Sequence, residues 1–208
     1  MAQNRTSRRT ATSTRRKKLV IIGISGAFGS FSEEAARTYM HKLGLKNQKI
    51  EPLITVEKVL AALEAGKIKL GIFPIENSNG GIVIEAVHAM ARHRFAIKKI
   101  FEIDVHHCLL VAPGVKADEI RTIVSHDQAI KQCRMYLKRV WPKARLREYP
   151  DTAIAAADLS NGKLPSSAAV IASRAAAARY GLDVLEESIQ DLKFNYTSFI
   201  VAGAVKQD

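Results

Sequence analysis

The sequence predicts an α/β fold in which two lobes of similar size enclose a cleft. First, short apolar runs alternate with segments whose apolar residues recur at helical spacing, which is typical of parallel sheets with right-handed crossovers. Second, a long strand-like run at 95–111 separates two such series and carries charged and histidine residues at its centre. Third, a final apolar run at 194–201 is expected to rejoin the first lobe. Two chain crossings at one hinge indicate a type II periplasmic-binding-protein-like architecture.

The predicted first lobe comprises residues 19–101 and 193–208. Its expected elements are strands at 18–25, 50–54 and 70–73, and helices that begin after Ser30, after Thr55 and near residue 82. Ser30 followed by Glu33 has the pattern of a capping box, and Thr55 stands where the second helix needs a cap. The run 95–111 is expected to form two strands, or one strand that passes between the lobes.

The predicted second lobe comprises residues 102–192. Its expected elements are strands at 121–124, 144–149 and 168–172, and helices that begin after Ser125, Asp151 and Ser173. Ser125 followed by Gln128 is a further capping-box pattern, and it should head a helix that continues to about residue 140. Gly181 is expected to end the helix after Ser173, since glycine suits the left-handed residue that terminates many helices.

The stretch Phe73-Pro74-Ile75-Glu76-Asn77-Ser78-Asn79-Gly80-Gly81 is expected to turn from a strand into a helix. Open α/β sheets bind ligands at such carboxyl strand ends. Four consecutive polar side chains and two glycines would suit a ligand that approaches the backbone, although a polar loop with a helix cap at Ser78 or Asn79 is the alternative. Capped helix N-termini, which bind anions, are expected to face the cleft at Ser30, Ser78, Ser125 and Ser173. The predicted ligand is therefore a small carboxylate or phosphate.

Composition and charge exclude several classes of protein. The chain has 208 residues and a net charge of +12, but seven of its 32 basic residues and none of its 20 acidic residues lie in 1–18. This basic tail is predicted to be disordered, with a nucleic-acid-binding arm or an organellar transit peptide as alternatives. Nucleic-acid binding is the least supported function, because the remaining chain is nearly charge-balanced. No apolar run approaches the ~20 residues of a membrane span, and no secretory signal is recognisable.

The cysteine and histidine positions give no metal-ligand pattern. Cys108 and Cys133 lack such spacing, which favours a reduced, cytoplasmic chain. His106 and His107 are adjacent in an expected strand, so their side chains should point to opposite faces and cannot chelate one metal together. We therefore expect no metal.

Several motifs occur together in one order. They are Gly26-Ala27-Phe28-Gly29-Ser30-Phe31-Ser32, Pro74-Ile75-Glu76-Asn77-Ser78 with Gly81, Ser125-His126-Asp127-Gln128-Ala129 with Gln132-Cys133, Asp151-Thr152-Ala153, Ala172-Ser173, Tyr180-Gly181-Leu182, Asp191, and Asn195-Tyr196-Thr197-Ser198-Phe199. With these motifs, the chain resembles prephenate dehydratases over about residues 19–203. The resemblance is far more specific than any single motif.

The chain departs from the family pattern at a few positions. Ala27 and Ser30 replace proline and threonine in the motif G-P-x-G-T-F-S, and Asp127 replaces proline in S-H-P-Q. Ser198 replaces the arginine of N-x-T-R-F, so a cation expected to meet a substrate carboxylate is absent. On that basis, Ser198→Arg should improve catalytic efficiency by at least about tenfold, with Arg174 and Lys193 as candidate compensating cations. We also expect no phenylalanine-sensing ACT domain after Phe199, and hence no inhibition of this ACT-less chain by phenylalanine.

The resemblance implies a carbon–oxygen lyase that converts prephenate to phenylpyruvate in L-phenylalanine biosynthesis, as a cytoplasmic homodimer without a cofactor. Arogenate is the alternative substrate. The implied catalytic residues are Thr197 as proton donor, with Asn77 and Glu76. The implied substrate-binding residues are Ser30, Phe31, Ser32, Ser78, Gly81, Ser125, Gln128, Asn195, Ser198 and Phe199. For Ser30, Ser32, Ser78, Ser125 and Gln128 the alternative role is helix capping alone. For Thr197 the alternative is a β-branched residue that only fills its strand. His126 is expected to be a partly buried surface histidine.

Two other functions remain open. Relatives of this fold decarboxylate prephenate without aromatising it, and the chain could also be a non-catalytic module that binds a small carboxylate. Retention of Thr197 and of the run 76–78 favours the dehydratase, whereas Ser198 would be the sign of lost catalysis.

Overall fold

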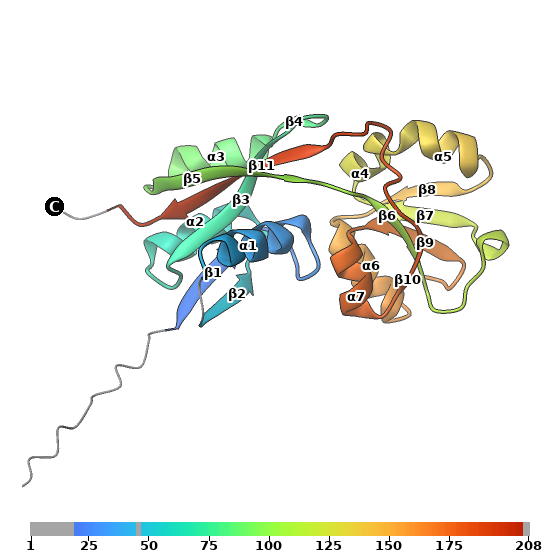
Figure 1. Cartoon of the computed structure of the whole chain (residues 1–208), viewed down its shortest axis with the longest axis horizontal. Helices are drawn as coiled ribbons and strands as arrows, with labels where there is room; N and C mark the ends of the chain where they lie inside the picture. Colours follow the sequence, from blue (N-terminus) through green and yellow to red (C-terminus); the bar gives the residue numbers. More distant parts are fainter. Residues whose placement is uncertain (1–18, 45–46, 206–208) are drawn as a thin grey trace, which may run out of the picture.

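The computed structural model describes residues 19–44 and 47–205 and contains two β-sheets in two lobes (Figure 1). The first sheet has the order β2 (Gln48–Pro52), β1 (Val20–Ile24), β3 (Leu70–Asn77), β11 (Tyr196–Gly203) and β5 (Ala96–Asp104), with β4 (Gly81–Ile82) paired to β3. The second has the order β10 (Asp183–Glu186), β6 (Cys108–Val111), β9 (Ala168–Ala172), β7 (Thr122–Ser125) and β8 (Arg145–Glu148). The predicted two-lobe α/β fold is confirmed. The basic tail predicted at 1–18 lies outside the described residues, and the exact lobe boundaries stay a prediction.

Helices cover both faces of the first sheet. Helix α1 (Phe31–Lys42) packs on the face that carries Phe199 and Val201 of β11. Helices α2 (Val56–Glu64) and α3 (Ile84–Arg92) pack on the opposite face, which carries Ile200 and Ala202. Neighbouring side chains of β11 therefore point to different layers of the lobe, as strand geometry requires.

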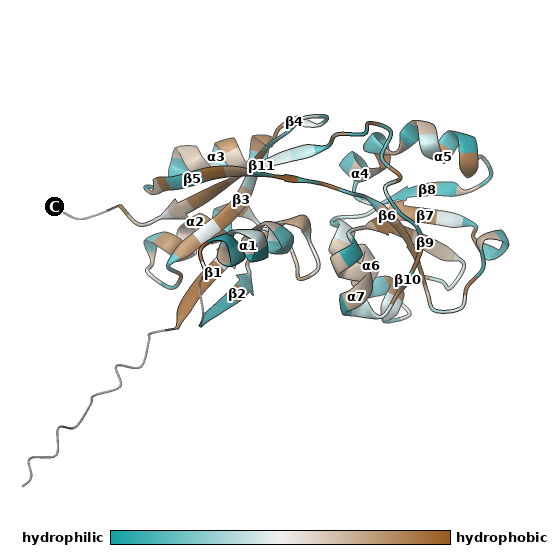
Figure 2. Cartoon of the chain, in the orientation of Figure 1, coloured by the Kyte–Doolittle hydropathy of each residue, from teal (hydrophilic) through white to brown (hydrophobic). Residues whose placement is uncertain are grey.

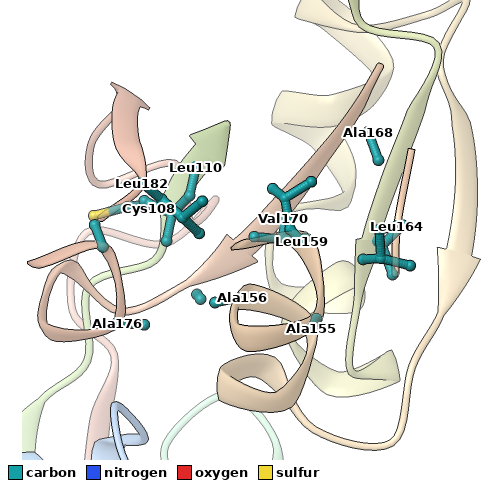
Figure 3. Close-up of a cluster of buried hydrophobic side chains, with 13 residues drawn as sticks. Cys108, Leu110, Ala155, Ala156, Leu159, Leu164, Ala168, Val170, Ala176 and Leu182 are labelled. Carbon is teal, nitrogen blue, oxygen red and sulfur yellow. The ribbon is translucent and has the colours of Figure 1, made fainter. Parts of the chain in front are cut away.

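The second lobe is built in the same way around its own sheet. Helices α6 (Thr152–Ser160) and α7 (Arg174–Tyr180) bring small side chains, among them Ala155, Ala156 and Ala176, against Val170 of β9 (Figure 3). Helices α4 (Asp127–Gln132) and α5 (Arg134–Val140) pack on the other face, and a short 3-10 helix (Ala117–Glu119) precedes β7. Inner strands such as β1 and β6 are hydrophobic, whereas edge strands β2 and β8 are hydrophilic (Figure 2), which suits a water-facing sheet edge.

The last strand corrects the prediction for the stretch 73–81. Strand β11 lies antiparallel between β3 and β5, with Thr197 opposite Asn77. This pairing extends β3 to Asn77, and a tight turn then leads into β4. Helix α3 begins only after Val83, which makes no side-chain cap. The predicted strand-to-helix turn with a cap at Ser78 or Asn79 is therefore wrong.

The predicted helix caps divide into two groups. Ser30, Thr55, Asp151 and Ser173 accept backbone N–H bonds at the starts of α1, α2, α6 and α7, as predicted. The two predicted capping boxes are wrong in detail. In the first, the Glu33 carboxylate accepts the N–H of Gly29 instead of the N–H of Ser30. In the second, Ser125 lies inside β7, and His126 is the residue that caps α4.

Other boundaries also differ from the prediction. The helix expected to run from 126 to 140 is divided at Cys133 into α4 and α5. Strand β10 was not predicted. None of the described helices is both long and apolar enough to cross a membrane.

A histidine clamp between α2 and α3 should make stability depend on pH. His93 lies 2.8 Å from Glu64 and 2.9 Å from Glu57, and these hydrogen bonds, the one to Glu64 first, raise the pKa of His93. A raised pKa adds stability below the ordinary histidine value of about 6.5, and that stability is lost as the pH rises through the folded value. We expect Tm to fall by roughly 1–3 °C over that range. In His93→Gln this fall should vanish, whereas His88→Gln on the exposed face of α3 should keep it; equal pH profiles for all three proteins would exclude the clamp.

Candidate active site

A cavity of about 430 Å³ lies between the two lobes. Helix α3 begins at its wall with Val83 and Glu85. Four more helices begin there, namely α1, α2, α4 and α6, which contribute Ser30, Phe31, Ser32, Thr55, Val56, His126, Gln128, Ala129, Asp151 and Thr152. These helices follow parallel strands, so their N-termini gather at the carboxyl edges of the two sheets. No lysine or arginine belongs to the lining within the described part of the chain. Backbone N–H groups are therefore the main positive groups offered to an anion.

The two crossing segments meet at the cavity. Val105, which follows β5, donates its N–H to the carbonyl of Asn195 at 2.8 Å, just before β11. Val105 and His107 line the cavity, and Asn195 is fully buried. The lobes also touch beside the cavity, where the Ser173 hydroxyl donates to the carbonyl of Gly29 at 2.6 Å. The site is therefore lined by residues of both lobes.

The side-chain amide of Asn77 has a fixed orientation. Its Oδ1 accepts the backbone N–H groups of Asn79 and Gly80 at 2.9 and 2.8 Å. Its Nδ2 consequently faces the Oγ1 of Thr197 and the Oδ1 of Asn195, each at 2.8 Å. Because the Thr197 oxygen accepts this bond, its own hydrogen stays available to a ligand in the cavity, which Thr197 lines.

Gln132 of α4 extends this network across the lobes. Its Nε2 donates to the Oδ1 of Asn77 at 2.9 Å. Its Oε1 accepts from the Nδ2 of Asn195 at 2.9 Å and lies 2.7 Å from the Nε2 of His107. Burial lowers the pKa of His107, so this ring is neutral near pH 7. Burial also raises the pKa of the Cys108 and Cys133 thiols, which keeps both in the thiol form.

The structure brings about half of the predicted site residues to the cavity. Those that line it are Asn77, Thr197, Ser30, Phe31, Ser32, Gln128 and Phe199. Those outside its lining are Glu76, Ser78, Gly81, Ser125, Asn195 and Ser198. His126, expected as a partly buried surface histidine, is exposed and also contributes to the cavity wall.

The residues outside the lining have other partners. Glu76 precedes Asn77 in β3 and is exposed, since neighbouring strand residues point to opposite faces. The Ser78 hydroxyl accepts the N–H of Tyr196 at 3.0 Å, and the Ser125 hydroxyl donates to the carbonyl of Ile171 at 2.6 Å. Gly81 is exposed in β4. Arg174, a candidate compensating cation, is exposed and paired with Glu187 instead of lining the cavity.

Ser198 also points away from the cavity, which alters what an arginine there would do. Its neighbours Thr197 and Phe199 line the cavity, whereas its hydroxyl donates to Glu102 of β5 at 3.2 Å. The geometric basis for the tenfold gain expected from Ser198→Arg is therefore absent. We expect this variant to pair with Glu102 and to keep kcat/KM within about twofold, as Ser198→Ala should. A tenfold gain in steady-state kinetics would show that an arginine at this position reaches the substrate.

Gln132 and His107 are site residues to which the sequence assigned no role. Gln132 stood within a quoted motif, so its position could have been found. For His107, the sequence feature that could have indicated a role was the presence of a histidine within the strand-like run 95–111. Within the described ranges, no group of three or more histidine, cysteine, aspartate or glutamate residues could hold a metal ion.

Comparison with known proteins identifies the family. The family model described as prephenate dehydratase matches residues 22–207. The chain belongs to the prephenate dehydratase family. The resemblance noted in the motifs is thereby confirmed, and the matched range includes both lobes.

Individual proteins of the prephenate dehydratase family are similar to this chain in sequence and in structure. Arogenate dehydratase 5, chloroplastic, from Arabidopsis thaliana is 35% identical over 181 residues, which are 86% of this chain and 41% of that protein. The bifunctional chorismate mutase/prephenate dehydratase of Stutzerimonas stutzeri is 33% identical, over 88% of this chain and 48% of that protein. The chain thus spans less than half the length of these curated relatives. A prephenate dehydratase from Arthrobacter aurescens, solved in complex with L-Phe, superposes with a TM-score of 0.81 at 28% identity, over 90% of this chain and 61% of that one.

Proposed function

We propose that this chain catalyses the decarboxylating dehydration of prephenate to phenylpyruvate, with arogenate as the alternative substrate. The observation that carries the proposal is the Thr197 hydroxyl, whose oxygen accepts an N–H from Asn77 at the wall of the interlobe cavity. That arrangement leaves a hydroxyl hydrogen for a departing group. Family membership supports the reaction class, and the names of the relatives support both substrates.

Thr197 supplies the proton in this mechanism. The bond between the ring and its carboxylate breaks, and carbon dioxide leaves. That electron pair moves through the ring double bonds and expels the ring hydroxyl, which takes the Thr197 proton and departs as water. The N–H of Asn77 stabilises the charge left on the Thr197 oxygen until water returns a proton. Aromatisation supplies the driving force, so a weakly acidic hydroxyl suffices.

The substrate carboxylates are held by backbone groups. Helices α1, α2 and α6 each begin at the cavity wall, with lining residues such as Ser32, Val56 and Thr152. Free N–H groups and the helix dipole favour an anion at these ends. Gln128 adds an amide to the wall while its Nε2 donates to the carbonyl of Gly80 at 3.2 Å, across the cleft.

The test is turnover by the purified chain. With prephenate, phenylpyruvate should appear as absorbance in alkali; with arogenate, phenylalanine should appear by chromatography. Release of carbon dioxide with a non-aromatic product would instead support the non-aromatising decarboxylase. Calorimetric binding without turnover would support the carboxylate-binding module.

We also propose that the chain acts as a homodimer in phenylalanine formation and in the cytoplasm. The Arabidopsis thaliana relatives carry the word chloroplastic in their names, so an organelle is the alternative location. Light scattering of the purified chain and the position of a fluorescent fusion in cells test these two points.

A further inference from the structure

His107 stands at the far end of a hydrogen-bond chain that leads to Thr197. It lies in the segment that crosses from β5 to β6, and 3% of its surface is exposed. Its ring packs edge-on against Phe31 of the cavity wall, with ring centroids 5.4 Å apart and planes at 82°. Within the described part of the chain, its Nδ1 is buried and has no hydrogen-bond partner. His107 takes no direct part in the reaction proposed for Thr197.

Every hydrogen bond in this series is donated in the direction from His107 toward Thr197. The N–H groups of Asn79 and Gly80 fix the Oδ1 of Asn77, so the Gln132 atom that meets this oxygen must be its Nε2. The Oε1 of Gln132 then faces His107 and must receive an N–H. The neutral ring of His107 is thereby fixed as the Nε2–H tautomer, with a bare Nδ1.

We propose that His107 is a positioning residue that polarises Thr197 through Gln132 and Asn77. Each amide in the chain accepts at its oxygen and donates at its nitrogen, so the dipoles add head to tail toward the Thr197 oxygen. Hydrogen bonds in such chains strengthen one another in a low-dielectric interior. This series of hydrogen bonds therefore stabilises the negative charge that develops on the Thr197 oxygen as its proton leaves. This inference rests on the proposed function of Thr197.

Removal of the imidazole donor should affect turnover more than binding. His107→Phe keeps an aromatic ring against Phe31 but takes away the N–H, and we expect kcat to fall by about five- to tenfold with KM changed less than twofold. His107→Gln places an N–H near the position of Nε2 and should restore most of kcat. His107→Asn, whose amide is too short to reach, should not. Equal losses in the phenylalanine and glutamine variants would overturn the role.

A double-mutant cycle separates this role from a general effect on folding. In the Thr197→Val background, His107→Phe should produce no further loss of residual turnover, because the group that it polarises is gone. A full five- to tenfold loss in that background would overturn the proposal. Nitrogen-15 shifts of the wild-type protein give a readout without turnover: they should show His107 as the Nε2–H tautomer near pH 7, and the Nδ1–H tautomer would contradict it. An active Thr197→Val variant would instead overturn the proposed function itself.

Discussion

Thr197→Val should lower kcat by about a thousandfold while substrate affinity stays within a few-fold of the natural value. General acid catalysis contributes roughly 10²–10⁴ to a rate, and valine keeps the shape of threonine but has no proton to give. The strand should tolerate the change, since Thr197 is buried in β11 and β-branched residues suit strands. The Nδ2 of Asn77 also retains the Oδ1 of Asn195 as a partner.

Single-turnover kinetics and calorimetric binding measure the two quantities separately. Thr197→Ser is the matched control, because it keeps the hydroxyl and should retain at least a tenth of the natural kcat. If the valine variant turned over at the natural rate, Thr197 would have no part in the mechanism. If the serine variant were as slow as the valine variant, packing and not the hydroxyl would explain the loss.

Ser173→Ala should give the largest loss of stability among single changes at the lobe contact. The Ser173 hydroxyl donates to the carbonyl of Gly29 and accepts the N–H of Ala176 at 3.0 Å, and 1% of the residue is exposed. Alanine would leave the buried carbonyl of Gly29 without this donor and would remove the side-chain cap from α7, although the N–H of Ala176 keeps a 3.1 Å bond to the Ser173 carbonyl; the combined cost is about 2–4 kcal/mol. A larger residue at position 29 could not replace the lost contact of the Ser173 hydroxyl. Gly29 has φ +84, and a Cβ there would lie 3.1 Å from the Cα of Ala176.

Thermal unfolding checks this expectation. For a chain of this size, the loss corresponds to a fall in Tm of roughly 5–12 °C. Ser166→Ala, at an exposed serine before β9, should change Tm by less than about 1 °C. A Tm for Ser173→Ala equal to that of the control would show that the lobes do not depend on this contact.

The parts of the fold that could be predicted are those with local causes. The caps at Ser30, Thr55 and Asp151 lie next to the helices that they start, so their side chains alone indicated them. Ser78 and Ser125 carry the same side chain but lie in a turn after β3 and inside β7, because pairing with distant strands decided their backbone. Sequence patterns contain no direct record of such pairing.

The candidate site was predictable to the extent that its residues occupy recognisable motifs. Asn77 and Thr197 were expected together, and they lie opposite each other in neighbouring strands. Whether the side chains of Ser198 and Glu76 point toward the cavity depends on which face of the sheet the cavity lies against. The motifs do not contain that information. His107 gains its role from Gln132, 25 residues further along the chain. Only the three-dimensional arrangement brings these two side chains together.

The position of β11 between β3 and β5 sets an order in which the lobes can form during synthesis. All strands of the second sheet come from one continuous segment, and Ile189 and Asp191 complete its core and the start of α5, so that lobe can fold once residue 191 has left the ribosome. The first sheet cannot close until residues 196–203 emerge, and until then β3 and β5 each leave an edge without its partner. Domains usually fold in the order in which they are made. Here the lobe that is begun first is completed last, and until then its open strand edges are free to pair with other chains.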